Sequence, residues 1–346
     1  MSNNKLSLQL NVDDFLPASD EEKESLTVLR KSVGFWQDGI RRLKKNKIAM
    51  VSLVVIVFVF IFSFLVPQFY PYSYEQQIRG SENLAPMQYS EKELEAKAAG
   101  ESVFPHVLGT DNLGRDYAVR VMMGSRVSLT VGLVASAIIL LIGSLYGSVA
   151  GFFGGWVDMI MMRIVDMIYT VPDILIIVLL SVAFDQPLKA LAQKPGFEWI
   201  QVIGVNLISI FVVFALLYWV GMARIVRSQI LILKEQEYVT AARALGASSG
   251  RIIKRHLLPN CIGQIVATTC LQIPSAIFTE SFMSFLGVGV LAPLTSLGSM
   301  CSDALGGIST YPYRLIIPAI IISIMILSFN LFGDGLRDAL DPRLKK

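Results

Sequence analysis

Residues 237–260, EYVTAARALGASSGRIIKRHLLPN, form an ordered polar pattern between long apolar runs. Residues 235–245 are good helix formers, and Gly246 then offers a helix stop and a turn. One of the serines that follow can cap a second helical stretch, which runs to about Leu257 before Pro259 ends it. The segment therefore predicts two short helices joined at a glycine.

The runs on either side of this segment are apolar enough to cross a membrane. Hydrophobic residues make up 53% of the 346 residues, charged residues only 16%, and the mean hydropathy is +0.58. A soluble domain is nearer a quarter charged, so this chain needs lipid around it. Six runs have roughly the 20 residues that a spanning helix requires: 48–66, 127–150, 158–184, 199–220, 263–287 and 314–333. The sequence predicts an all-α integral membrane protein with six transmembrane helices.

The positions of Lys and Arg predict the orientation of these helices. Five basic residues directly precede the first helix, and segment 221–262 carries seven, whereas segment 288–313 has none. Basic residues next to spans favour the cytoplasmic side. We therefore expect both termini and the 221–262 loop to be cytoplasmic, and the 67–126 loop to be extracytoplasmic.

The ends of the chain differ from the helical core in composition. Residues 1–28 are rich in Asp and Glu and predict a disordered acidic tail. In residues 29–47, apolar side chains recur every three or four positions among Lys and Arg, which predicts an amphipathic helix in the membrane interface. A soluble basic linker is the alternative, but it would expose Trp36. The five-helix core is predicted at 127–335, followed by a cytoplasmic tail at 336–346.

The motifs of several enzyme and cofactor classes are missing from the sequence. No G-x-x-x-x-G-K-[ST] occurs, so we expect no phosphate cradle and no hydrolysis of ATP by this chain itself. The three cysteines lack a C-x-x-C spacing, and the two histidines are too far apart for the familiar zinc motifs. A net charge of +3 is too small to suggest a nucleic-acid partner. The sequence predicts no metal, no cofactor and no catalytic residues.

Residues 237–260 resemble the coupling loop of type I ABC-transporter permeases, in the version of oligopeptide and dipeptide uptake systems. The family pattern is E-A-A, three residues, Gly, nine residues, Ile, one residue, Leu-Pro. The chain supplies matching residues at Ala241, Ala242, Gly246, Leu258 and Pro259. It departs from the general pattern with Thr240 at the Glu place and His256 at the Ile place. Both departures are usual in the peptide-uptake branch.

Three further stretches carry the same resemblance, in the family's order. They are LGTDNLGRDYAVRVMMGSRVSL at 108–129, ESFMSFLGVG at 280–289 and GDGLRDALDPRLK at 333–345. Two positions depart from the residue that is common in the family, Val119 and Leu297. Four stretches in order are far more specific than one short motif.

The resemblance implies a fold, a function and partners. The fold would be that of a type I ABC importer permease with a cytoplasmic coupling helix, placed in a bacterial cytoplasmic membrane. The function would be ATP-driven import of oligopeptides or dipeptides, with a sister permease, two ATPase subunits and an extracytoplasmic binding protein as partners. The long loop after the first helix is what implies a different sister chain. The residues expected to couple to the ATPase are Tyr238, Ala241, Ala242, Arg243, Gly246, Arg251, His256, Leu258 and Pro259.

Charged residues inside the predicted spans are candidates for the solute path, because such charges are costly and face a bundle interior or water. Arg163 and Asp166 are three positions apart and can pair on one helix face. Asp173 lies two turns beyond Asp166, with Pro172 between them, and Glu280 lies in the fifth span. These side chains either line the path of a peptide or hold helices in register, and the sequence leaves both readings open.

The segment before the second span has the same ambiguity. Gly109 and Gly114 predict tight turns, and Asp111, Arg115 and Asp116 lie among them. The three charges either close those turns or meet the binding protein. We expect a structural turn that also contributes to the docking surface.

Other functions remain as alternatives. The same machine could carry another solute, such as a metal–chelator complex, since the motifs do not identify cargo. A carrier driven by an ion gradient would show an inverted repeat with broken helices in both halves, which the sequence lacks. A membrane scaffold without transport would need neither intramembrane charges nor an ordered cytoplasmic loop.

Overall fold

The computed structural model describes residues 34–170, 172–292 and 294–340, and these residues form helices and loops without a strand. The long helices are α3 (Lys47–Phe64), α6 (Tyr117–Phe153), α7 (Gly155–Tyr169), α8 (Asp173–Ala192), α10 (Val205–Leu217), α11 (Trp219–Leu233), α14 (Leu258–Phe285) and α16 (Tyr313–Leu340). The shorter elements are α2 (Phe35–Lys45), α4 (Val66–Phe69), α5 (Glu91–Ala98), α9 (Trp199–Ile203), α12 (Glu237–Ala244), α13 (Ser249–Ile252), the π-helix η2 (Ile253–Leu257), α15 (Leu297–Ala304) and the 3-10 helix η3 (Leu305–Gly307).

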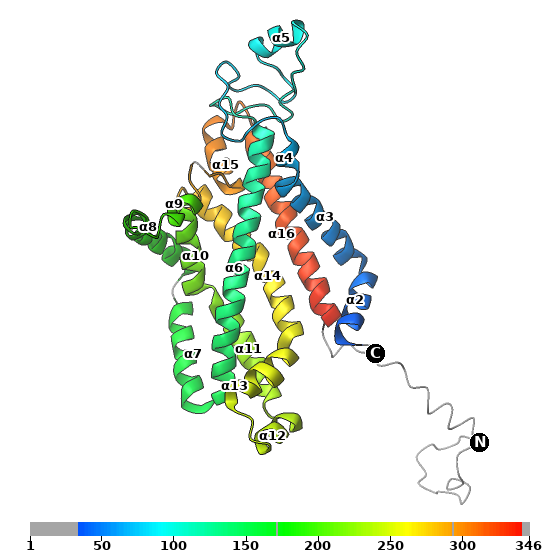
Figure 1. Ribbon diagram of the computed structural model, residues 1–346, viewed down its shortest axis with the longest axis vertical. Helices are drawn as coiled ribbons and strands as arrows, with labels where there is room; N and C mark the ends of the chain where they lie inside the picture. The colour runs from blue at the N-terminus through cyan, green and yellow to red at the C-terminus, as the bar shows by residue number, and fades with distance from the viewer. Residues whose placement is uncertain (1–33, 171, 293, 341–346) are drawn as a thin grey trace, which may run out of the picture.

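The helices form an elongated bundle with two distinct ends (Figure 1). One end carries α5 in a loop of residues 70–116, called the α5 loop below, and the other carries α12 in a loop of residues 234–257, called the α12 loop. In the described part of the chain, six helical segments are long and apolar enough to cross a membrane. The predicted all-helical membrane fold is therefore confirmed.

The central helix α6 is longer than its predicted span of 127–150. Asp116 caps its N-terminus by accepting a hydrogen bond from the Val119 N–H at 2.9 Å, and Gly154 ends it with φ of +66°. Its 37 residues contact α3, α10, α11 and α14. The core therefore lies on both sides of α6.

Helix α2 lies within the segment 29–47 that was predicted to be an interfacial amphipathic helix, and its Trp36 is 49% exposed. Gly39 of α2 lies against Leu340 at the end of α16, where an added Cβ would stand 2.8 Å from the leucine side chain. Both described ends of the chain therefore lie together, at the α12 end of the bundle (Figure 1). The predicted acidic tail at 1–28 lies outside the described residues.

The prediction of a single third span at 158–184 is wrong. The chain forms two helices here, because α7 ends at Tyr169 and α8 begins at Asp173. Pro172 has no N–H for a continuing helix, and a proline disfavours helical backbone in the residue before it. Helix α8 then leaves the bundle sideways (Figure 1).

The fourth span and the loop after it also differ from their predicted bounds. Gly204, with φ of +99°, separates α9 from α10, and a turn at Tyr218 separates α10 from α11. Helix α11 continues to Leu233, so the loop begins at residue 234 rather than 221. The composition of residues 221–233 did not reveal this extension. Arg224 and Arg227 made the segment look like a polar loop, whereas they lie on the amphipathic helix α11.

The fifth and sixth helices are also longer than predicted. Pro259 does not end the second short helix as expected, since it lies in the first turn of α14, where no N–H is required. The π-helix η2 joins α13 directly to α14. The sixth helix, α16, extends to Leu340 and so includes part of the predicted tail, whose residues 341–346 lie outside the described residues.

Candidate functional site

The α12 loop contains the two short helices that the sequence predicts. Gly246 ends α12 with φ of +78°, and its N–H donates to the Arg243 carbonyl at 2.9 Å. The next N–H, of Ala247, donates to the Ala242 carbonyl at 3.0 Å. This pair of bonds is a Schellman cap, which requires positive φ at the glycine position. The predicted turn at Gly246 is therefore confirmed in its backbone conformation.

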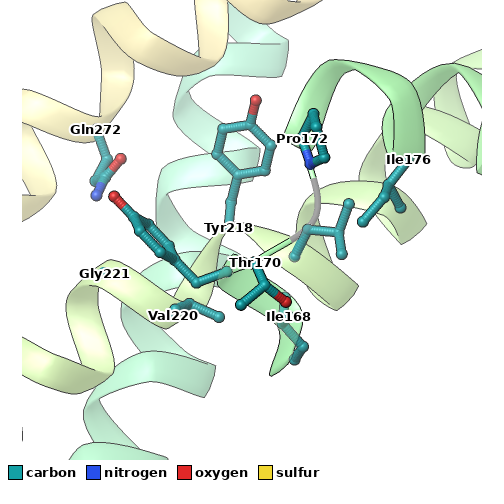
Figure 2. A pocket seen from close by; sticks show the side chains of 10 residues that line it. Ile168, Thr170, Pro172, Ile176, Tyr218, Val220, Gly221 and Gln272 are labelled. Carbon is teal, nitrogen blue, oxygen red and sulfur yellow. The ribbon is translucent and has the colours of Figure 1, made fainter. Parts of the chain in front are cut away.

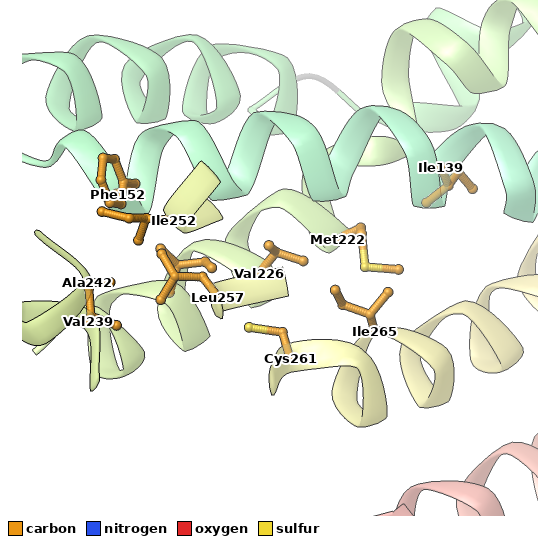
Figure 3. Close-up of a cluster of buried hydrophobic side chains, with 11 residues drawn as sticks. Ile139, Phe152, Met222, Val226, Val239, Ala242, Ile252, Leu257, Cys261 and Ile265 are labelled. Atoms are coloured by element: carbon orange, nitrogen blue, oxygen red, sulfur yellow. The ribbon is translucent and has the colours of Figure 1, made fainter. Parts of the chain in front are cut away.

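The inner face of the α12 loop is apolar and packs on the bundle. Figure 3 shows Val239 and Ala242 of α12, with Ile252 and Leu257, gathered beside Phe152 of α6. Side chains of α11 and α14 complete this buried cluster. The loop is thus a fixed part of the fold and not a linker.

The outer face of the same loop is basic. Arg243, Arg251, Lys254 and Arg255 are exposed, and Leu245 protrudes beside Gly246 with 89% of its surface exposed. A protruding leucine among basic side chains has the composition of a docking surface. Sequence reasoning missed Leu245, although its position next to the helix-ending glycine was a usable signal.

The expected coupling residues divide between these two faces. Ala242 is buried and Leu258 packs against the buried cluster, so both belong to the support of the loop. The Tyr238 hydroxyl accepts a hydrogen bond from the Asn260 side chain at 3.3 Å, and burial raises the pKa of Tyr238. The remaining expected residues are exposed or half-buried: Ala241, Arg243, Gly246, Arg251, His256 and Pro259.

A pocket of about 490 Å³ lies between the α7–α8 break, the α10–α11 turn and helix α14 (Figure 2). It is lined by Ile168, Tyr169, Thr170, Pro172, Ile176, Leu217, Tyr218, Val220, Gly221 and Gln272. The lining comes from the end of α7, the start of α8, the turn between α10 and α11, and the middle of α14. None of these residues was predicted from the sequence as a site residue.

The charged residues of α7 pair with α11 and not with each other. Asp166 accepts a hydrogen bond from Arg224 at 2.8 Å, and Asp158 pairs with Arg227. No ion pair joins Arg163 to Asp166 among the described residues, so that prediction is wrong. Sequence spacing finds partners within one helix, whereas Arg224 lies 58 positions from Asp166.

Two other expectations about this region change with the helix break. Asp166 and Asp173 lie on different helices, α7 and α8, so they do not share one helical face as predicted. The backbone of Asp173 begins α8, and its side chain lies outside the described residues. Arg163 is exposed on α7.

Glu280 is enclosed by serine hydroxyls. Its side chain is 0% exposed and accepts hydrogen bonds from Ser128 of α6 at 2.8 Å and from Ser284 of α14 at 2.7 Å. A third hydroxyl, of Ser281, lies at 3.3 Å. Glu280 therefore fastens α14 to α6, which agrees with the structural reading of this residue and places it outside the pocket.

The charge of Asp111 in the α5 loop is also satisfied by its neighbours. Asp111 is buried and accepts hydrogen bonds from the backbone of Leu113 at 2.8 Å and Arg115 at 2.9 Å, and it pairs with the side chains of Arg115 and Arg120. Burial alone would raise the pKa of Asp111, but these hydrogen bonds and the Arg120 charge outweigh it and lower the pKa. Gly109 and Gly114 adopt positive φ, as predicted turns require.

Asp116 joins this loop to α6 through a buried histidine. His106 lies 2.7 Å from Asp116 and 3.1 Å from Glu93 of α5. Burial alone would lower the pKa of His106, but the hydrogen bond to Asp116 and the charge of Glu93 raise it. Asp111 and Asp116 are thus buried and hydrogen-bonded within the turn. Of the three charges predicted for docking, only Arg115 has a partly exposed side chain.

A glycine stripe brings α6 and α11 into backbone contact. Gly143, Gly147 and Gly151 follow one face of α6, and a Cβ at Gly147 would stand 2.3 Å from the Ala223 carbonyl oxygen. Small residues at four-residue spacing allow this approach in membrane helices. The sequence analysis missed the stripe, although its spacing was visible in GSLYGSVAG.

The chain is similar to known proteins over most of its length. The profile of binding-protein-dependent transport system inner membrane components matches residues 143–346, and that of the N-terminal TM domain of oligopeptide transport permease C matches residues 34–86. The chain is 40% identical to the oligopeptide transport system permease protein OppC of Bacillus subtilis (strain 168), over 96% of this chain and 97% of that protein. It is 41% identical to the dipeptide transport system permease protein DppC of the same organism, over 96% of this chain and 93% of that protein. Inward-facing structures of the MetNI methionine ABC transporter superpose with a TM-score of 0.47 at 16% identity, covering 64% of this chain and 96% of the matched chain.

Proposed function

Because this chain belongs to the family of binding-protein-dependent transport system inner membrane components, we propose that it is the permease subunit of an ATP-driven importer of oligopeptides or dipeptides. Its relatives are named for these two cargoes. Family membership argues against a carrier driven by an ion gradient and against a scaffold. The subunit itself would hydrolyse no ATP and would depend on two ATP-binding partners.

The observation that carries this proposal is the two-sided α12 loop. Its apolar face is buried against α6, α11 and α14, so a force on the loop reaches three membrane helices directly. Its outer face presents Leu245 and basic side chains to solvent. Such a loop suits docking on an ATPase subunit, with Arg243, Gly246 and Arg251 at or near the contact.

The orientation follows from the same loop. If α12 docks on an ATPase, the α12 end of the bundle is cytoplasmic, as the basic residues favour. The described ends of α2 and α16 lie at that end, so both termini would be cytoplasmic. The membrane would then be a bacterial cytoplasmic membrane, and the α5 loop would face the extracytoplasmic binding protein.

The solute path is proposed to run between this chain and a sister permease. The pocket at mid-bundle and the Asp166–Arg224 pair beside it would form this chain's share of that path. Arg163 and Asp173 are proposed to flank it, whereas Glu280 would act by holding α14 to α6. Arg115 is the residue of the α5 loop that we propose for contact with the binding protein.

The test compares two glycines with the same backbone conformation. Gly246 ends α12 with φ of +78°, and Gly287 ends α14 with φ of +80° and the same pair of capping bonds. No atom lies within 4 Å of a Cβ added at either position. Valine at either site therefore introduces similar strain, about 1–2 kcal/mol, without a clash.

Gly246→Val is expected to weaken retention of the ATPase subunits or to uncouple ATP hydrolysis from peptide uptake. Gly287→Val, at the opposite end of α14, should leave both unchanged. The measurements are ATPase retention on the purified complex, ATP hydrolysis and uptake of labelled peptide, with uptake of a metal–chelator complex measured in parallel. Normal uptake and normal ATPase retention in Gly246→Val would contradict the proposal.

A further inference from the structure

The pocket in Figure 2 lies beside two breaks in the helical backbone and a proline inside a third helix. Helix α7 ends at Tyr169, and α10 turns into α11 at Tyr218. Pro274 interrupts the hydrogen bonding of α14 two residues after Gln272. At membrane depth, irregular backbone is tolerated only where it is buried in protein or lines a water-filled cavity. Because a pocket of about 490 Å³ lies beside these breaks, they fit the second case, a cavity that admits polar groups.

The position of the pocket along the helices supports this depth. Tyr218 falls within the apolar span Val205–Leu233, and Gln272 lies at the middle of α14. The pocket is therefore far from both ends of the bundle. A solute crossing the membrane along this chain must pass this level.

The face that carries the pocket is unsuited to lipid. Asp166 and Arg224 are both partly exposed, and the Arg224 guanidinium lies over the Tyr169 ring at 4.5 Å from its centroid. Tyr169 in turn lines the pocket. Exposed charges on membrane helices face water or protein, because contact with hydrocarbon is costly.

The lining residues that the structure describes carry no formal charge, and their polar side-chain groups are hydroxyls and one amide. The Thr170 hydroxyl is already committed to the Met167 carbonyl at 2.8 Å, and the Tyr218 hydroxyl lies 3.0 Å from Thr279 Oγ1. The Gln272 amide, by contrast, forms no hydrogen bond with any residue that the structure describes. Gly221 opposite it leaves room, since an added Cβ would still be 3.9 Å from Gln272 Nε2.

We propose that this pocket binds the main chain of the peptide in transit, with the Gln272 amide exchanging hydrogen bonds with a peptide unit. An amide offers donors and an acceptor, which match the N–H and C=O that every peptide presents. Tyr169, Tyr218 and the aliphatic residues then contact side chains without selecting their charge. The absence of charge among the described lining residues suits a cargo of variable sequence. This inference rests on the proposed function and names the chemistry of its path.

The first test uses photocrosslinking in the complete transporter. A benzophenone amino acid replaces Tyr169 in the pocket or, as control, Phe58, which is exposed in an apolar groove between α3 and α16. During ATP-driven uptake, a labelled peptide is expected to crosslink at position 169 and not at position 58. A crosslink from position 169 to the sister permease alone would overturn the inference, because the pocket would then be a subunit interface.

The second test removes the amide with a matched control on the same helix. Gln272→Leu is expected to lower the peptide crosslink at position 169 by about three- to tenfold, the factor that loss of a typical hydrogen bond gives. Gln264→Leu, two turns earlier on α14 and outside the pocket, should leave it unchanged. The loss should be similar for peptides of equal length and different side chains.

Two outcomes separate this inference from the proposed function. Equal crosslinking in both leucine variants, while the unmodified transporter imports peptide, would overturn the role of Gln272 and leave the proposed function standing. Failure of the unmodified transporter to import any peptide would instead refute the proposed function itself.

Discussion

The two loops at opposite ends of the bundle are held in place by different forces. In the α5 loop, buried charges bind one another, as Asp111 with Arg120 and His106 with Asp116 and Glu93 show. In the α12 loop, apolar side chains are buried and the basic ones remain in solvent. The buried charges of the α5 loop are therefore not available to a partner, whereas others in the same loop, such as Glu91 and Lys92, remain exposed. The contrast indicates that a charged residue near a predicted docking site is available to a partner only where the fold leaves its side chain exposed.

Among the tests of this difference between the loops, removing the Asp111 side chain should have the largest effect on stability. Asp111→Ala removes the buried carboxylate that pairs with Arg120. Because the Arg120 charge stays buried, the free energy of unfolding should fall by about 3–5 kcal/mol. Asp303→Ala is the control, since Asp303 also contacts Arg120, at 3.4 Å, but is 62% exposed. Thermal unfolding of the purified complex, with proteolysis of residues 70–116, measures both. Similar destabilisation by the two variants would mean that burial of the pair does not matter.

Creating a cavity in the apolar face of the α12 loop should have the next largest effect on stability. Leu257→Ala creates a cavity at a fully buried side chain and should cost about 2–4 kcal/mol, seen as faster hydrogen exchange in residues 234–257. Leu245→Ala, at the exposed tip, should leave exchange unchanged and weaken ATPase binding instead. If Leu245→Ala destabilised the loop as much as Leu257→Ala, the division into a supporting face and a docking face would be wrong.

Raising the pH should have the smallest effect, and only on the α5 loop. The pKa of His106 is raised in the folded protein above the ordinary value of 6.5. Its contribution to stability is therefore complete below pH 6.5 and is lost as the pH rises through the folded pKa. Proteolysis of residues 70–116 should be faster at pH 8.5 than at pH 6, relative to a His106→Asn variant. A loop that became more resistant as the pH rose would contradict the sign.

The sequence predicted the helical fold because length and hydropathy alone decide whether a segment can cross a membrane. It also predicted the turn at Gly246, since few residues other than glycine adopt that conformation. It failed at the break before Asp173, because the apolar run 158–184 continues through Pro172 and predicts a single helix. Proline kinks some membrane helices and ends others, and tertiary packing chooses between them.

The pairing of charges was the least predictable feature. Arg163 and Asp166 are close in sequence, yet Asp166 pairs with Arg224 from another helix. The pocket was unpredictable for the same reason, because Tyr169, Tyr218 and Gln272 come from helices that only the fold brings together. The glycine stripe of α6, in contrast, could have been found from its spacing.

Helix α6 connects the two loops mechanically. Its 37 residues contain no proline and correspond to about 55 Å of helix, well beyond the roughly 30 Å of a bilayer core. At its N-terminus, Asp116 is hydrogen-bonded to His106. At its C-terminus, Phe152 packs in the buried cluster that supports α12. Gly147, near the α12 end, is in close contact with the α11 backbone. Phe152 and Asp116 are thus the two ends of one unbroken helix, so the support of the α12 loop and the anchor of the α5 loop belong to a single backbone element.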